Sequence, residues 1–498
     1  MKEDSRRKVI ITLILAIILV LATVLRLYSL SEESLWLDEC FTLDYGSKSI
    51  HSLVETLKND VHPIGYYLPQ QIMIHYFGSS EIHLRLLSVF FGVLSVYLTF
   101  LLGRRLFSWK EGLLAAFFVS ISYTSILYSQ EAKMYSMFAA FFLLSLFYFV
   151  KVLEKPSYLN LLIFSISAAL LLHTHILGIA ILVGYLVFYL TVYALNLRRK
   201  EFRQEADFSF FRRMQLSSRF LFVPLVVLIL YLPWLKILVI YQLPLLYNFV
   251  GAKLIEKLGI NLLPLVVAGA VALVIAYLMV LYLIITDKIN LQKIFASFKR
   301  CFSFFTHEAT LLVLLLGFIV ADFFVSTYLF SSVSIVRFCL FILPLLYVFL
   351  SRILLKMKRN VVAVIIFVLF VASASVELCT YYSIDSKEQY HEAADYIETH
   401  ASSADVLYLH RATIAKLCFD YYYSGNVEEV RLIYPGEDDH LVVERTSGKE
   451  NAYLILSHNF HTQDYFKSRF DSLYRLEDEI QFIGVTIYKY RVNDDPDQ

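Results

Sequence analysis

The sequence predicts an α-helical polytopic membrane protein that ends in a small α/β domain outside the membrane. Of its 498 residues, 58% are hydrophobic and only 17% are charged, and the mean hydropathy is +0.63. Soluble domains are closer to half apolar and a quarter charged, so this excess is too large for an ordinary core. Frequent charges and alternating helix and strand patterns begin only after about Tyr381. The sequence therefore divides into residues 1–380, predicted to hold the transmembrane part, and residues 381–498.

About eleven apolar runs are long enough to cross a bilayer as helices, and a count of about ten to thirteen fits the pattern. The first run is too long for the apolar part of a signal peptide and no small-residue cleavage site follows it, so we expect it to be retained. The expected spans are residues 9–28, 84–102, 111–127, 134–151, 158–173, 176–195, 219–238, 262–285, 309–328, 335–351 and 360–379.

The orientation follows from the basic residues, which gather in alternate connections between the expected spans. Connections such as 1–8, 104–110, 198–219 and 352–359 are rich in Lys and Arg, and the intervening ones are poor. Basic connections stay in the cytoplasm, so the N-terminus is predicted to be cytoplasmic. The segment 31–85 and the C-terminal domain then lie outside the plasma (inner) membrane.

The C-terminal residues are predicted to form one α/β domain, and 381–498 is long enough for an independent core. Helices are expected at 387–400, 413–423 and 463–472, with strands at 405–409, 430–434 and 452–457 and a hairpin within 475–492.

Charge and cysteine content exclude several classes of protein. A net charge of +1 implies no electrostatic attraction to nucleic acid. No internal or inverted repeat of the transporter type is visible. The five cysteines have no paired spacing such as CxxC, so neither a zinc site nor a disulfide framework is indicated. They are Cys40, Cys301, Cys339, Cys379 and Cys418.

The segment 31–85 is a polar island between two apolar spans, and it contains the adjacent acids Asp38 and Glu39. Two acids on an outside loop often serve only as solvated charges. Here the apolar Trp36-Leu37 before them and Cys40-Phe41 after them would hold the pair at the membrane surface, where unused charge is costly. A carboxylate in that place can take a proton from a sugar acceptor.

A second cluster in this island reads Asp60-Val61-His62-Pro63, before a predicted interfacial helix in IGYYLPQQ. Pro63 suits the first turn of that helix, so capping and turn formation explain the cluster as well as function does. The functional alternative is that the His62 imidazole faces the acidic pair.

Two short outside turns carry further polar residues. In Tyr128-Ser129-Gln130-Glu131-Ala132-Lys133, Ser129 could cap the next helix with Glu131 in its first turn, or Glu131 could be functional. His173-Thr174-His175 could bind a metal, but hydrogen bonding inside the turn is the more common role of such a pair.

Arg337 is expected at the outer end of the tenth span. It could extend to the interface, pair with the intramembrane Asp322, or bind a lipid phosphate, whose geometry matches a guanidinium.

The stretches SLWLDECFT, DVHPIGYYL, FGSSEIHLRLLSVFFG…GRRLF and YSQEAKMY together resemble the membrane glycosyltransferases of the GT-C type. The resemblance is to the RgtA/B/C/D-like members of families 39 and 83, related to protein O-mannosyltransferases and lipid A aminoarabinose transferases. It is strong over residues 25–180, weaker through SIVRFCLFILPLL and KEQYHEAADYIETH, and thin between 200 and 310.

The resemblance implies transfer of one sugar, with inversion, from a polyprenyl-phosphate donor to a hydroxyl acceptor on the extracytoplasmic face. The acceptor would be a glycolipid, a lipopolysaccharide-type glycan or a protein. A divalent cation, Mg or Mn, could bridge carboxylates and phosphate, but no ligand set in the sequence demands it. The implied catalytic residues are Asp38 as base, Glu39 supporting it, and Glu131. The resemblance assigns contacts with the donor phosphate and lipid to His62, Lys133 and Arg337. It assigns the lining of a possible pocket to Asp60, Tyr66, His173 and His175.

This sequence departs from many relatives in having one proline in DVHPIGYY and Glu131 in place of Asp. Two other classes stay open: a polysaccharide polymerase or ligase that uses a lipid-linked oligosaccharide, and a non-enzymatic lipid or sugar transporter.

Overall fold

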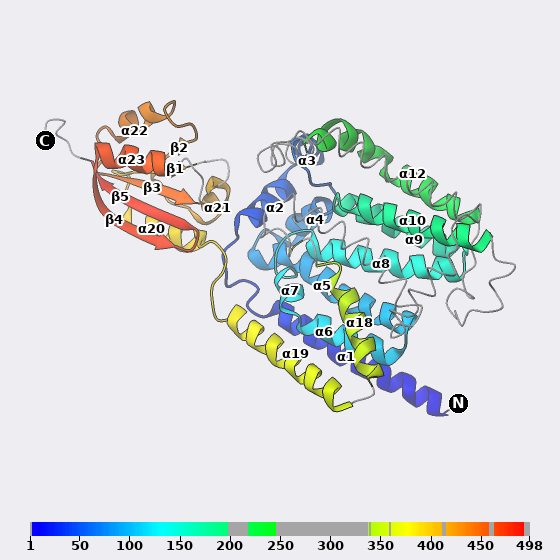
Figure 1. The fold of residues 1–498 in the computed structure, drawn as a ribbon. Coiled ribbons are helices and arrows are strands. Elements are labelled where there is room, and N and C mark those ends of the chain that lie inside the picture. The colour runs from blue at the N-terminus through cyan, green and yellow to red at the C-terminus, as the bar shows by residue number, and fades with distance from the viewer. Residues whose placement is uncertain are drawn as a thin grey trace, which may run out of the picture.

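The computed structural model describes residues 2–197, 218–245, 337, 340–357, 360–410, 415–457 and 463–492. These residues form a bundle of helices and a C-terminal sheet with its own helices (Figure 1). The expected spans 262–285 and 309–328, with Asp322, lie outside the described residues.

Five helices are long and apolar enough to cross a membrane, by length and composition among the described residues. They are α1 (Lys2–Leu27), α5 (Glu81–Leu106), α8 (Tyr135–Glu154), α19 (Asn360–Tyr381) and the continuous pair α12 (Phe222–Ile237) and η2 (Leu238–Gln242). Shorter apolar helices are α9 (Tyr158–Thr174) and α10 (Gly178–Leu197), and α18 (Leu343–Lys356) follows Arg337. The chain is therefore a multi-pass membrane protein, and the count of eleven spans stays a prediction.

The expected span 111–127 is two helices rather than one. α6 (Trp109–Ile121) ends before Ser122, whose extended backbone separates it from α7 (Tyr123–Leu127). α5 and α6 cross closely, because a Cβ on Gly112 would lie 2.6 Å from the Phe100 carbonyl oxygen. α8, whose side chains are mostly buried, packs between α5 and α9. α1 and α19 expose most of their apolar side chains, as expected of helices that face lipid.

Three short helices fill the segment between α1 and α5: α2 (Leu37–Ser47), α3 (Ile50–Leu57) and α4 (Tyr67–Phe77). α4 begins four residues after Pro63, so the prediction that Pro63 lies in its first turn is wrong. Ser129 does not cap α8, which begins at Tyr135 after Met134. Instead the Ser129 hydroxyl accepts a hydrogen bond from Arg26 Nε, 3.1 Å away.

The C-terminal region contains a five-stranded sheet in the order β2-β1-β3-β5-β4. β1 (Val406–His410) pairs in parallel with β2 (Glu428–Leu432) and β3 (Asn451–Ser457), whereas β5 (Val485–Arg491) is antiparallel to β3 and to β4 (Arg475–Phe482). Successive side chains along β1 point to opposite faces of the sheet. Leu407 and Leu409 pack with α20 (Tyr390–His400) and α21 (Ala415–Tyr422). Val406 and Tyr408 face α22 (Asp439–Thr446) and α23 (Gln463–Leu473).

All the expected C-terminal elements are present within a few residues, and α22 is an additional helix that the sequence reading did not predict. The division of the chain at residue 380 stays a prediction. The layer that contains Leu407 also contains Leu35, Cys40, Leu84 and Ala132, from the segment between α1 and α5, the start of α5 and the connection before α8. The C-terminal sheet and these parts of the helical region therefore share one buried cluster.

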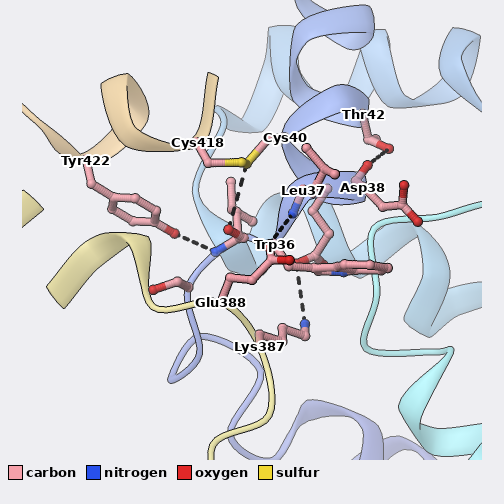
Figure 2. The surroundings of a disulfide bond; sticks show 12 residues. Trp36, Leu37, Asp38, Cys40, Thr42, Lys387, Glu388, Cys418 and Tyr422 are labelled. Atoms are coloured by element: carbon pink, nitrogen blue, oxygen red, sulfur yellow. Dashed lines mark hydrogen bonds and ion pairs between the residues drawn. A yellow bond between two sulfur atoms is a disulfide. The ribbon is translucent and has the colours of Figure 1, made fainter. Parts of the chain in front are cut away.

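A disulfide joins Cys40 in α2 to Cys418 in α21, with Cα atoms 5.5 Å apart (Figure 2). The cysteine spacing indicates no disulfide framework, so the sequence did not predict this bond. The two cysteines are 378 residues apart in sequence and meet only because α21 packs against α2. A rule that reads spacing between near neighbours cannot detect such a pair.

Candidate active site

The acidic pair lies in the first turn of α2, where backbone N–H groups favour negative charge. The two neighbouring carboxylates nevertheless have different surroundings. The Glu39 side chain is fully buried, whereas 27% of the Asp38 side chain is exposed.

Both oxygens of Glu39 are occupied by donors. Arg85 binds them in a fork, with Nε 2.8 Å from Oε1 and Nη2 2.8 Å from Oε2. The Ala132 amide donates to Oε1 at 2.8 Å, and Lys387 Nζ lies 3.4 Å from Oε2. Burial would raise the pKa of Glu39, but the charges of Arg85 and Lys387 lower it to about 2. We call Glu39, Arg85 and Lys387 the buried clamp.

Asp38 contacts two cations from distant parts of the chain. Arg337 Nη1 lies 3.0 Å from Asp38 Oδ2, and Lys133 Nζ lies 3.8 Å from Oδ1. The Arg337 guanidinium also stacks over the Trp36 ring, 4.8 Å from its centroid. We call Asp38, Lys133 and Arg337 the open ion cluster. The predicted pairing of Arg337 with Asp322 lies outside the described residues.

Glu131 is buried beside both groups, and its Oε2 has no hydrogen-bond partner among the described residues. Burial raises the pKa of Glu131 to about 8, against the opposing charges of Lys387 and Arg337, and the negative charges of Glu39 and Asp38 add to the rise. At neutral pH this side chain is therefore a neutral carboxylic acid, able to donate a hydrogen bond.

A second polar group forms around His62. Asp60 Oδ1 lies 2.7 Å from His62 Nδ1, and the Tyr45 hydroxyl donates to Asp60 Oδ2 at 2.9 Å. The His62 backbone carbonyl accepts from Gln242 at 3.0 Å. The imidazole is thus paired with Asp60, not with the Asp38-Glu39 pair as the sequence hypothesis expected. Burial opposes the ionised form of Asp60, but the hydrogen bond and charge of His62 lower its pKa overall.

The histidine turn packs against this group. The His62 and His175 rings have centroids 6.5 Å apart, and burial together with the His62 charge lowers the pKa of His175 to about 3. The Gly65 amide donates to the His173 carbonyl at 2.8 Å. A Cβ at Gly65 would lie 2.5 Å from that oxygen, so only glycine fits this contact.

Tyr66 is fully buried rather than exposed on a surface. Its hydroxyl lies 2.9 Å from Ser88 Oγ, which donates to the Lys133 carbonyl at 3.0 Å. Tyr66 thereby fixes the backbone next to the open ion cluster. The adjacent Tyr67 hydroxyl is buried with no partner among the described residues.

Sequence reasoning missed several residues that support the site. The sequence pattern gives no role to Arg85, Lys387 or Glu388, although it places the last two in an expected helix at 387–400. Glu388 Oε2 accepts the Leu37 amide at 2.9 Å, and burial raises the pKa of Glu388 to about 7. No local pattern marks these residues as site residues, because their partners are far away in sequence.

Among the described residues, no group of three or more His, Cys, Asp or Glu side chains could hold a metal ion. Mg or Mn therefore stays a prediction, and no step below depends on it.

A family model described as dolichyl-phosphate-mannose-protein mannosyltransferase matches residues 61–203. This range includes His62, Glu131, Lys133 and the histidine turn. Among proteins with curated functions, none matches the chain in sequence.

Solved structures share the fold along almost the whole chain. ArnT from Cupriavidus metallidurans in the apo state is 13% identical, with a TM-score of 0.56 over 95% of this chain and 97% of that chain. The Archaeoglobus fulgidus oligosaccharyltransferase in the apo form is 11% identical, with a TM-score of 0.56 over 97% of this chain and 74% of that chain. The same oligosaccharyltransferase tethered with an acceptor peptide is 12% identical, with a TM-score of 0.54 over the same shares.

At these identities the likeness shows the fold, and it confirms the helical membrane architecture with a small C-terminal mixed sheet. The family model and the shared fold together support a GT-C type membrane glycosyltransferase.

Proposed function

We propose that this protein transfers a single sugar from a polyprenyl-phosphate-linked donor to the hydroxyl group of a glycolipid, a lipopolysaccharide-type glycan or a protein. The reaction occurs on the extracytoplasmic face of the plasma (inner) membrane, with the N-terminus in the cytoplasm and residues 381–498 outside. The donor class is supported by the family model, whose description names a dolichyl-phosphate sugar.

The observation that carries this proposal is the open ion cluster. Asp38 is a partly exposed carboxylate in contact with two cations, Lys133 and Arg337. A base and two cations meet the needs of this reaction. Asp38 takes the proton of the acceptor hydroxyl while the hydroxyl oxygen attacks the anomeric carbon. The bond from that carbon to the phosphate oxygen breaks, and the negative charge of the leaving polyprenyl phosphate is stabilised by Lys133 and Arg337.

One displacement of this kind inverts the configuration of the anomeric carbon. Polyprenyl phosphate leaves as an anion, so a strong general acid is not required. Glu131 is proposed to assist as a neutral acid that donates a hydrogen bond to the sugar or the acceptor. Glu39 acts through its contacts with Arg85 and Lys387, as a positioning residue.

The His62 group is proposed to complete the donor site. Its side chain is 29% exposed, and Asp60 orients it through the hydrogen bond to Nδ1, leaving Nε2 for the donor phosphate. The residues proposed to hold His62 and the neighbouring backbone in place, and so to line the donor pocket, are Asp60, Tyr66, His173 and His175.

Transfer of a whole oligosaccharide is the second candidate, because the oligosaccharyltransferase from Archaeoglobus fulgidus shares the fold as well as ArnT does. The two candidates differ in the donor. Offering a polyprenyl-phosphate monosaccharide and a lipid-linked oligosaccharide separately to the purified protein distinguishes them.

The main test compares wild type with Asp38→Asn in membranes that contain a labelled polyprenyl-phosphate sugar. We expect labelled acceptor with the wild type and about a 10²- to 10⁴-fold lower rate with the variant, because a positioned base contributes that much. Addition of a chelator tests Mg and Mn in the same assay. If Asp38→Asn is well expressed and all glycoconjugates are unchanged, Asp38 is not the base and the transporter alternative is favoured.

A further inference from the structure

Helix α2 carries Asp38, yet its N-terminus is bound from outside the helix by a residue more than 300 positions away. The first backbone N–H groups of any helix lack partners inside the helix. The cap residue Trp36 has no side-chain oxygen to accept from them. In this structure the Leu37 amide, the first of α2, donates to Glu388 Oε2 at 2.9 Å (Figure 2).

We propose that Glu388 is a positioning residue for sugar transfer: by binding the first amide of α2, it fixes the helical turn that carries Asp38. This inference rests on the proposed function. It extends that function by making the segment that leads into the C-terminal sheet a part of the active site.

Glu388 is itself held firmly by the C-terminal sheet. Gly484, in the turn between β4 and β5, has a φ of +71°, and a Cβ there would lie 2.6 Å from Glu388 Cγ. The next residue, Gln389, is bound twice to the same turn: its amide donates to the Ile483 carbonyl at 2.9 Å, and its side-chain oxygen accepts from the Ile483 amide at 3.0 Å. The position of the hairpin therefore determines the position of the Glu388 carboxylate.

The residues on either side of Glu388 bind the same part of the outside loop. The Ser386 and Lys387 amides both donate to Glu33 Oε1, and Lys387 Nζ reaches Glu39 in the buried clamp. On the opposite side of the Leu35–Cys40 stretch, the Tyr422 hydroxyl accepts from the Leu35 amide at 2.7 Å. With the Cys40–Cys418 disulfide, these contacts attach both ends of the first turn of α2 to the C-terminal region.

The charges around Glu388 suit a supporting role rather than a second base. Its carboxylate lies at the positive end of the α2 dipole, where an acceptor is stabilised. Asp38 and Glu39 oppose its ionisation, and Arg337 favours it. What the helix requires is an oxygen that accepts the Leu37 N–H, and a glutamine can supply such an oxygen without charge.

The test uses the full-length protein with Glu388→Ala, Glu388→Gln and the matched control Glu392→Ala. Glu392 belongs to the same interface, where its Oε2 accepts from Ser34 Oγ at 3.2 Å, before the start of α2. Formation of the Cys40–Cys418 disulfide, followed by thiol labelling with the other three cysteines replaced by serine, verifies that each variant is folded.

We expect Glu388→Ala to lower kcat about 10- to 100-fold with little change in the donor KM, because a misplaced catalytic group loses rate rather than binding. Glu388→Gln should recover most of kcat, and Glu392→Ala should behave as wild type. Wild-type kcat in a disulfide-bonded Glu388→Ala protein would overturn the proposal. So would equal losses in Glu392→Ala, or a Glu388→Gln variant as slow as Glu388→Ala.

Hydrogen exchange of the peptide that covers residues 35–42 gives a readout that does not need activity. We expect faster exchange in Glu388→Ala than in wild type and in Glu392→Ala, because the Leu37 amide loses its acceptor. If the wild type transfers no sugar from the labelled donor, the proposed function fails. The exchange comparison still decides whether Glu388 holds α2: faster exchange supports that step, and unchanged exchange overturns it.

Discussion

Asp38 of the open ion cluster and Glu39 of the buried clamp are adjacent in sequence, yet their carboxylates have opposite surroundings. Every oxygen of Glu39 is bound, by a guanidinium fork, an ammonium group and a backbone amide, and the side chain is fully buried. Asp38 is partly exposed and faces cations that could bind a phosphate instead. The comparison teaches that two acids adjacent in sequence can differ completely in their surroundings: one is fully occupied by buried contacts, and the other keeps a partly exposed carboxylate.

Glu39→Ala should have the largest effect, because it leaves Arg85 and Lys387 buried without the carboxylate that they bind. Removing one partner of a buried ion pair costs about 3–5 kcal/mol of folding free energy. We expect a large loss of folded protein, measured as the thermal unfolding midpoint in detergent. Asp38→Asn is the matched variant and should unfold close to wild type. Equal stability of the two variants would contradict the division of roles.

Removal of the disulfide by Cys40→Ser with Cys418→Ser tests how strongly α2 depends on the C-terminal region. A disulfide typically contributes about 2–4 kcal/mol to stability. We expect a lower unfolding midpoint for the double variant, and the same decrease in wild type after reduction. Cys379→Ser is the control, because Cys379 is exposed and unpaired in the described part of the chain. A midpoint insensitive to reductant would show that noncovalent contacts alone hold α2.

Arg337→Ala and Arg337→Lys examine the open ion cluster. Hydrogen bonds to charged groups contribute about 1.5–3 kcal/mol, so loss of the guanidinium should raise the donor KM about 10- to 100-fold. Lysine keeps the charge but not the fork, and it should lie between alanine and wild type. Because Arg337 is outside the buried clamp, both variants should keep the wild-type unfolding midpoint. An unchanged KM in Arg337→Ala would remove Arg337 from the donor site.

The sequence could predict only those features that depend on neighbouring residues. The C-terminal strands and the long apolar helices follow from residue periodicity and run length, which neighbouring residues determine. The short helix α22 was missed because its eight residues carry little apolar pattern. The acidic pair was found, but only the family resemblance distinguished Asp38 from Glu39. The local pattern could not, since Arg85 and Lys387 lie 46 and 348 residues from Glu39. Cys418 and Glu388 were missed for the same reason.

The smallest expected effect concerns Glu131, which lies between the two regions. Its folded pKa is about 8, above the usual value of 4.5, so the folded state holds a proton that the unfolded state has lost between these pH values. Stability should therefore fall as pH rises through that window, and Glu131→Gln should remove this contribution. Above about pH 8, ionised Glu131 adds negative charge near Asp38, and we expect the transfer rate to decrease.

Glutamine keeps a hydrogen-bond donor at this position, so Glu131→Gln should stay within about tenfold of the wild-type rate at pH 7 and lose the decrease above pH 8. The measurement is kcat over KM for the donor from pH 6 to 9, with Glu131→Ala as the variant that lacks the donor. If transfer instead required the ionised form, the wild-type rate would rise through pH 8 and Glu131→Gln would be inactive throughout. Glu131 would then be a second ionised carboxylate of the open ion cluster, because its unpaired oxygen would act as an acceptor rather than as a donor.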